Sequence, residues 1–216
     1  MPKRAMTEAA KAAKAQAIMD CTAKLFLAAD YEAVKMSHVA REMHLSNGIL
    51  FVYFPTKQTL FFSLLMRAYH ARVDALQQRL LAKPALDFAQ LSALILDDLN
   101  AQLDSILYVR LEAIRAAILE KNIQPGLVLS MKTKLYKRMI SLAQKASIPG
   151  VISAQDILKL FHVQTAMIAG FYIASDLPPS LRAQFLENDL EAFVHDTKQD
   201  TLSAMRLYLQ AYQATR

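Results

Sequence analysis

The sequence predicts an all-α protein of about nine helices. Glycine is scarce, with 4 in 216 residues, whereas Ala, Leu, Lys and Gln, which favour helices, are abundant. Apolar residues recur at spacings of three and four through most of the chain, and runs of β-branched residues that would favour strands are few. A single Cys and no signal-like segment favour a reducing cytoplasm and a chain without disulfides.

The first helix is expected at residues 8–29, where Ile18, Leu25 and Phe26 form an apolar stripe. Either Cys21 or Thr22 completes the stripe. A reactive thiol is conceivable at Cys21, but a small core residue is the simpler interpretation, because free Cys is usually buried.

Residues 34–60 contain two short helical patterns separated by a polar turn. Val39 lies on the apolar side of the first pattern, Leu45 fills the turn, and Leu50 and Phe54 form the inward face of the second. The outward face of the second pattern carries uncharged side chains: Ser46, Asn47, Gly48, Ile49, Phe51 and Tyr53. Such a helix fits a DNA major groove, because Asn can pair with adenine and apolar groups can contact thymine methyl groups.

Three stretches share a combined spacing that is more specific than a helix-turn-helix pattern alone: residues 18–31, 39–48 and 50–57. They resemble the first helix, the I-A … V-S-x-G motif and the L-Y-x-Y-F-x-[ST]-K motif of the tetracycline-repressor (TetR) family of transcriptional regulators. The resemblance implies a helix-turn-helix DNA-binding domain at residues 1–60. It also implies an effector-binding and dimerisation domain at residues 61–216, joined to the first through a long fourth helix.

The chain departs from the family pattern at three positions. Asp30 and His44 stand where the family usually has Gly, and both residue types tolerate the left-handed backbone conformation at some cost. Phe51 stands where the family usually has Tyr, so one hydroxyl contact is missing. We therefore expect a less stable DNA-binding domain of unchanged fold.

Positive charge is denser near the N-terminus, where residues 1–57 hold eight Lys and Arg against five Asp and Glu. The excess lies in the tail, at Lys3, Arg4, Lys11 and Lys14. A solvated tail and a basic arm that follows a DNA groove are both compatible with this pattern.

Further phosphate contacts are expected from the second helix and from the start of the fourth. Ser37 and His38 lie where relatives meet DNA, although His38 is equally compatible with a plain exposed position. Thr56 is a predicted N-cap, and Lys57 follows it in the first turn. Because a cation there opposes the helix dipole, a DNA phosphate would explain Lys57, and the resemblance implies Tyr53 and Lys57 as backbone clamps.

The fourth helix is expected at residues 57–81 and ends before Lys83–Pro84. Residues 85–122 contain no Gly or Pro, and the N-cap signal at Asp104–Ser105 predicts two helices there. Four more helices follow in the remaining sequence: residues 125–147, 154–175, a short one after 181 and a final one that ends near 212.

Two DNA half-sites require a dimer, and small residues at four-residue spacing permit close helix approach. We expect a four-helix interface that involves Ala166, Gly170, Ala174, Leu202, Met205 and Leu209, with packing inside one chain as the alternative. The resemblance implies an effector cavity, for which the candidate residues are Tyr69, Phe88, Tyr108, Arg110, Met139, Phe161, His162 and Thr165. A plain core is the alternative for each of them.

Enzyme classes receive no support from the sequence. Motifs for nucleophilic Ser, phosphate loops and zinc proteases are absent, and no two His lie at i, i+4, so neither catalytic residues nor a metal nor a cofactor is expected. Asp97 and Asp98 are adjacent and would point apart on a helix. The apolar run at residues 165–174 is too short for a bilayer, so no membrane association is expected.

The leading hypothesis is a cytoplasmic homodimeric repressor that binds double-stranded operator DNA and is released by a small, largely apolar effector. A DNA-binding architectural or co-regulatory dimer without an effector is the first alternative. An all-α lipid- or drug-sequestering protein is the second.

Overall fold

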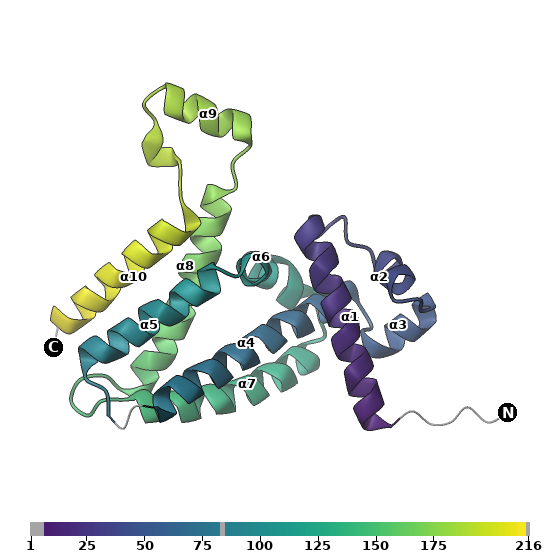
Figure 1. Ribbon diagram of the computed structural model, residues 1–216, viewed down its shortest axis with the longest axis horizontal. Helices are drawn as coiled ribbons and strands as arrows, with labels where there is room; N and C mark the ends of the chain where they lie inside the picture. Colours follow the sequence, from purple (N-terminus) through teal and green to yellow (C-terminus); the bar gives the residue numbers. More distant parts are fainter. Residues whose placement is uncertain (1–6, 83–84, 215–216) are drawn as a thin grey trace.

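The computed structural model describes residues 7–82 and 85–214 of the chain (Figure 1). Over these residues it contains ten α-helices, one π-helical turn and two 3-10 turns, and the only β pairing is an isolated bridge between Ile148 and Ile152. The all-α prediction is confirmed, and the helix count is close to the expected one. Lys3, Arg4 and the predicted stop at Lys83–Pro84 lie outside the described residues.

Three helices form the N-terminal unit: α1 (Glu8–Ala28), α2 (Met36–Glu42) and α3 (Asn47–Tyr53). Phe61 is fully buried, and its ring makes edge contacts with the rings of Phe26 and Tyr31 at centroid distances of 5.0 and 4.9 Å. Thr22 takes the buried position on the α1 stripe, since its hydroxyl donates to the carbonyl of Ile18 at 2.8 Å. Cys21 is half-buried beside it, and burial raises the pKa of its thiol.

The turn between α2 and α3 requires the left-handed conformation that we expected at His44, whose φ is 52°. The corresponding expectation for Asp30 is wrong. Asp30 is not among the described non-Gly residues with positive φ, so the exit of α1 carries no such strain. The departure from Gly therefore has a conformational cost at one of the two positions only.

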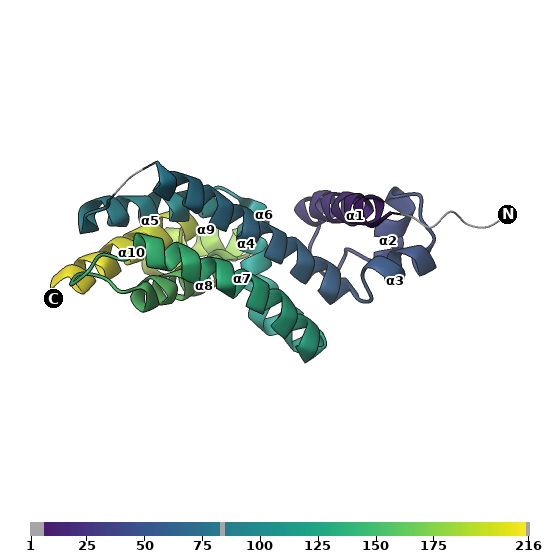
Figure 2. The ribbon, with the colours of Figure 1, turned by 90° about the horizontal axis from the view of Figure 1, so that it is seen from below.

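The long helix α4 (Lys57–Leu81) connects the two parts of the molecule. Thr56 is its N-cap, as predicted, and its hydroxyl accepts from the amide of Thr59 at 3.0 Å. The first half of α4 packs on α1, and the second half packs on the bundle formed by the later helices (Figure 2). A displacement of α4 within the bundle would therefore also displace the N-terminal unit.

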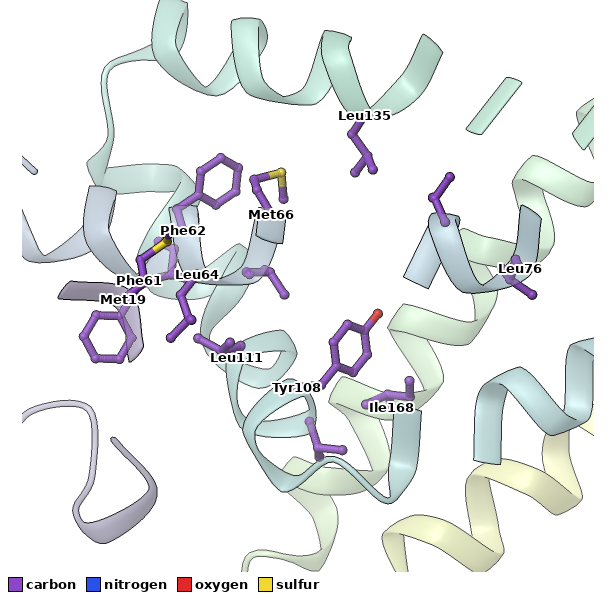
Figure 3. Close-up of a cluster of buried hydrophobic side chains, with 14 of the residues drawn as sticks. Met19, Phe61, Phe62, Leu64, Met66, Leu76, Tyr108, Leu111, Leu135 and Ile168 are labelled. Atoms are coloured by element: carbon purple, nitrogen blue, oxygen red, sulfur yellow. The ribbon is translucent and has the colours of Figure 1, made fainter. Parts of the chain in front are cut away.

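The bundle contains α5 (Phe88–Leu103), α6 (Ile106–Ile114), α7 (Pro125–Ala146), α8 (Ala154–Ser175) and α10 (Thr197–Ala214). The break between α5 and α6 lies at the predicted place, with Ser105 as N-cap of α6. Between α6 and α7, the chain forms a π turn η1 (Arg115–Leu119) and a 3-10 turn η2 (Glu120–Asn122), which the sequence pattern did not predict. Side chains from α4, α6, α7 and α8 share one interior (Figure 3).

The segment between α8 and α10 projects away from the bundle (Figure 1). It contains α9 (Pro179–Glu187) and a 3-10 turn η3 (Glu191–Phe193), and neither has a buried residue. The ring of Phe193 lies 5.8 Å from that of Phe185, yet Phe193 is 59% exposed. We call residues 176–196 the arm.

Among the described residues, α8 is long and apolar enough to pass a composition test for a membrane span, and so is the bent pair α3 and α4 taken together. The sequence-based expectation considered only the shorter run at residues 165–174. In the fold, α8 packs on α6, α7 and α10, while Ala166, Gly170 and Ile173 on it remain exposed.

Candidate DNA interface and ligand cavity

Helix α3 presents an exposed, largely apolar surface on a rigid base. Its N-cap Ser46 accepts from the amide of Ile49 at 3.3 Å, and Leu50 is fully buried against the rest of the unit. On the other side, Ile49 is 48% exposed, Phe51 45% and Val52 83%. Exposed apolar residues on a helix that is anchored from behind indicate a contact surface rather than a folding requirement.

The structure brings most of the residues expected to contact DNA to this surface. Five are exposed around α3: Ser46, Asn47, Gly48, Ile49 and Phe51. Tyr53 is half-buried at the end of the helix. The sequence interpretation missed Val52, although it lies three residues after Ile49 and so shares the same outward side of the helix.

Lys57 lies against its own chain. Its ammonium donates to the carbonyl of Tyr31 and lies 3.8 Å from the centroid of the Tyr31 ring, and burial lowers its pKa. Tyr31 therefore supplies an internal reason for a cation at this helix start, beside the DNA phosphate that we expect from the sequence. A role for Lys57 as a clamp would require its side chain to leave Tyr31.

The other expected phosphate contacts lie on α1 and α2. Ser37 is exposed at the start of α2, and Lys14 is half-buried on α1. The ring of His38 is half-buried, with its Nε2 atom 3.6 Å from the carboxylate of Glu42. A phosphate at this point would compete with Glu42 for a protonated His38.

The bundle contains a cavity of about 150 Å³ that opens between α4, α7 and α8. Most of its wall is apolar and comes from Met66, Val73, Leu135, Met139, Leu158 and Phe161. The polar part of the wall is formed by Tyr69, Arg72, Arg115, Glu120, Lys132, Tyr136, His162 and Thr165. A mostly apolar hollow with a few polar groups is the usual form of a small-molecule site.

Five of the eight residues expected to line an effector cavity line this one: Tyr69, Met139, Phe161, His162 and Thr165. The other three do not line it. Phe88 stacks on Tyr212 at a centroid distance of 5.9 Å, where α5 meets α10. Tyr108 packs in the core against Tyr69, and Arg110 points toward α1. Helical spacing alone does not tell which helices border a cavity, and no residue of α6 lines this one.

One wall of the cavity contains a buried arginine that the sequence analysis did not single out. The Arg72 side chain is 3% exposed, and its Nε donates to the Asp98 carboxylate at 2.8 Å. The guanidinium also donates to the side-chain oxygen of Gln164 and contacts the ring of Phe161. Its helical register could have revealed it, because Arg72 continues the buried row of α4 seven residues after Leu65.

A second polar chain begins at Tyr69, three residues before Arg72 on α4. Tyr69 donates to the buried carboxylate of Glu112, which also accepts from Nε of Arg115 at 2.9 Å. Arg115 in turn donates from Nη1 to Glu120 at 3.1 Å, and Nζ of Lys132 lies 2.8 Å from the same carboxylate. Burial raises the pKa of Tyr69, so its hydroxyl keeps the proton that it donates.

The bundle contacts the DNA-binding unit through Arg110 of α6 as well as through α4. The guanidinium of Arg110 donates to the carbonyl of Ala29 at 2.8 Å and to the carboxylate of Asp30 at 3.3 Å. It also lies 4.3 Å from the centroid of the Phe26 ring. A shift of α6 would therefore act directly on the C-terminal end of α1.

The residues expected at a dimer interface divide into two groups. Ala166 and Gly170 are exposed on one side of α8, while Ala174 and Leu202 are half-buried. The expectation is wrong for Met205 and Leu209, which are buried inside the single chain, where α10 packs on α5 and α8. The exposed side of α10 instead carries Leu207, which is 67% exposed, and Tyr208.

The sequence matches two family models. Residues 18–64 match the model described as bacterial regulatory proteins of the tetR family. Residues 66–216 match the model described as a tetracyclin repressor-like C-terminal domain. The chain matches no curated protein sequence.

Several solved structures share the fold. A putative TetR-family transcriptional regulator from Mesorhizobium loti aligns with a TM-score of 0.55 at 16% identity, covering 97% of this chain and 98% of that chain. The regulator FadR from Bacillus subtilis, in complex with stearoyl-CoA, aligns with a TM-score of 0.54 at 12% identity, covering 91% of this chain and 96% of that chain. FadR from Bacillus halodurans aligns with a TM-score of 0.52 at 12% identity, with 97% of each chain covered.

Proposed function

The chain belongs to the tetracycline-repressor (TetR) family of bacterial regulatory proteins, whose members are DNA-binding transcriptional regulators, and on this premise we propose that it is a homodimeric repressor released from its operator by a small ligand. The α3 surface would contact the bases, and Ser37, His38, Tyr53, Lys57 and the basic residues near the N-terminus, including Lys14, would contact phosphates. The cavity of the bundle would hold the effector. The operator is double-stranded DNA with two half-sites.

The observation that carries this proposal is the exposed surface of α3. Gly48 on this surface gives additional support. A Cβ at position 48 would meet only the hydroxyl of Ser46, at 4.0 Å, so nothing inside the described chain requires a glycine there. A glycine within a helix costs about 1 kcal/mol relative to Ala. Close approach of an external partner, such as the edge of a base pair, would explain why the helix lacks a side chain at this point.

The proposed DNA-binding function is tested by selection of bound duplexes from a random pool. We expect a motif with twofold symmetry whose half-sites are centred about one helical turn apart, because both copies of α3 would enter the major groove on one side of the duplex. Binding without sequence preference would instead favour the architectural alternative. No binding even at low salt would contradict the proposal altogether.

The substitution Gly48→Ala should have opposite effects on folding and on DNA binding. We expect the free energy of unfolding to rise by about 0.5–1 kcal/mol, since Ala favours the helix and meets no atom closer than 4.0 Å. Affinity for the selected DNA should fall, because the added methyl group would meet the bases. Urea unfolding and a fluorescence anisotropy titration measure the two effects, and unchanged DNA affinity would show that α3 does not approach DNA closely at Gly48.

The proposed second copy would pack on the exposed sides of α8 and α10. Ala166 and Gly170 permit close approach of two helices, while Ile173, Leu207 and Tyr208 present apolar area to water. The arm begins at the end of this face and adds exposed Leu186, Leu190 and Phe193 to it. A twofold dimer that covers this continuous surface would also cover the arm, which has no buried residue of its own.

The substitution Leu207→Asp should weaken the dimer. A twofold interface contains the residue twice, so the variant dimer lacks two buried leucines and must desolvate two carboxylates. We expect the dissociation constant of the dimer to rise about 100-fold or more. Sedimentation velocity over a concentration series measures this. Leu129→Asp is the matched control, because Leu129 is 68% exposed on α7, outside the proposed interface, and should leave the dimer intact. Equal effects of the two variants would contradict the proposed face.

Ligand control is proposed to act through the contacts between the bundle and α1. An occupied cavity would displace the walls formed by α4 and η1, and η1 continues directly from α6. Arg110 would pass a shift of α6 to Ala29 and Asp30 at the end of α1, which would change the spacing of the two α3 helices. Coupling of this kind is typically worth about 1–3 kcal/mol. FadR from Bacillus subtilis, which shares the fold, was solved with stearoyl-CoA, and this supports a ligand-binding role for the bundle.

A further inference from the structure

The cavity presents mainly positive charge to whatever enters it. Its wall contains three cationic side chains, Arg72, Arg115 and Lys132, and one acidic side chain, Glu120. Two further acids hold the arginines but do not line the cavity. Asp98 and Glu112 bind these guanidinium groups from behind, so the cationic groups stand between them and the cavity.

Glu120 occupies the place where an anion would be held best. Its carboxylate lies between Nη1 of Arg115 at 3.1 Å and Nζ of Lys132 at 2.8 Å. Burial opposes its negative charge, but hydrogen bonds from Lys132 and Arg115 outweigh burial and lower its pKa. The carboxylate therefore bridges two cations from different elements, the π turn η1 and helix α7.

The position of Glu120 also permits it to leave. It is the first residue of the short turn η2, and its side chain remains 21% exposed, so it could reach water without crossing the core. Arg115 would stay in place, because Nε still donates to the fully buried carboxylate of Glu112. Departure of Glu120 would leave a cationic pair at the edge of an apolar hollow.

We propose that the ligand of this cavity is a small organic monocarboxylate with an apolar body about the size of one aromatic ring, and that its carboxylate replaces Glu120 between Arg115 and Lys132. This inference rests on the proposed role of the cavity as the effector site. The volume of about 150 Å³ limits the apolar body, since a cavity of that size holds benzene. When the ligand carboxylate replaces that of Glu120, the number of charges in the cluster stays the same.

A cationic ligand fits these contacts less well. It would have to take the place of Lys132 on Glu120 while facing Arg72 and Arg115, and like charges at close range are unfavourable in a poorly hydrated site. A neutral ligand could fill the apolar part of the cavity, but it would leave the bridge of Glu120 intact. The expected ligand thus has an effect on η2 that a neutral molecule of the same shape lacks.

The inference is tested with three acids and their neutral amides: benzoate, 4-methylbenzoate and hexanoate. Binding is measured by isothermal titration calorimetry of the full chain without DNA. An acid that fits the cavity should bind at least about 10-fold more tightly than its amide, because hydrogen bonds to charged groups are worth roughly 1.5–3 kcal/mol. The proposal is overturned if no acid binds more tightly than its amide.

Two variants test the exchange with Glu120. Glu120→Gln removes the internal competitor and should tighten acid binding by about 10-fold while amide binding stays the same. Lys132→Met should weaken acid binding by a similar factor. Lys137→Met is the control, because Lys137 is exposed on α7, does not line the cavity and should leave acid binding unchanged. Weaker acid binding by a folded Glu120→Gln variant would overturn the exchange.

The same acids then separate this inference from the proposed function. If an acid binds as described and lowers affinity for the selected DNA, the carboxylate ligand class and the effector role of the cavity are both supported. If it binds and DNA affinity stays the same, the ligand class stands and the effector role of the cavity fails. If only the neutral amides bind and release DNA, the effector role stands and the carboxylate inference is overturned.

Discussion

Replacement of Asn47 by Ala is expected to weaken binding to the selected DNA by about 30-fold to 10⁴-fold. Asn47 is exposed at the first position of α3, where its amide is proposed to pair with an adenine in the major groove. A bidentate contact of this kind is worth about 1–3 kcal/mol, and a dimer on two half-sites would lose it twice. Affinity for unrelated DNA should change little, because the phosphate contacts remain.

Fluorescence anisotropy at fixed salt measures both affinities. Gln78→Ala is the matched control, since it removes an exposed side-chain amide from α4, far along the helix from the N-terminal unit. A loss of affinity that is equal for selected and unrelated DNA would assign Asn47 to phosphate contact rather than base contact. An unchanged affinity for both would remove α3 from the interface and contradict the proposed function.

Replacement of Arg72 by Met is expected to lower the free energy of unfolding by about 3–5 kcal/mol. The substitution leaves the Asp98 carboxylate, whose side chain is 6% exposed, without its cation. The side-chain oxygen of Gln164 also loses the hydrogen bond that the Arg72 guanidinium donates to it. The penalty arises from an isolated buried charge, so it should be far larger than the net stabilisation by the pair itself.

Urea unfolding at one fixed protein concentration measures this effect, because a dimer is stabilised by mass action. The double substitution Arg72→Met with Asp98→Leu should recover most of the loss, since it removes both charges. Arg67→Met is the control on the same helix. Its partner Asp20 is 62% exposed, and the expected loss is about 1 kcal/mol or less. Similar losses for the two single variants would show that burial of the Arg72 pair carries no penalty.

The helical pattern sufficed to predict most of the fold. Caps at Thr56 and Ser105 placed two helix starts correctly, because a cap depends on residues within one turn of itself. Leu50 and Phe54 were correctly predicted to face inward on the same basis. The π turn at residues 115–119 was missed, since an i→i+5 turn has no local residue pattern that distinguishes it from an α-helix.

The candidate sites were predicted unequally well. Most of the α3 surface could be found from the sequence because one short helix carries it, and only Val52 was missed. The ionic groups of the cavity could not, since Arg115, Glu120 and Lys132 come from three successive elements and meet only when these pack together. Met205 and Leu209 show the opposite error, because an apolar row on α10 fits an interface between two copies as well as a core within one.

The sequence alone thus determined the helices, their order, the outward face of α3 and the family, because each depends on spacing along the chain. Tertiary structure decided which charged groups share an interior, which side of each helix remains open and where Lys57 and Arg110 point. These outcomes depend on contacts between residues distant in sequence, whose partners are selected by burial and charge only after the helices have packed.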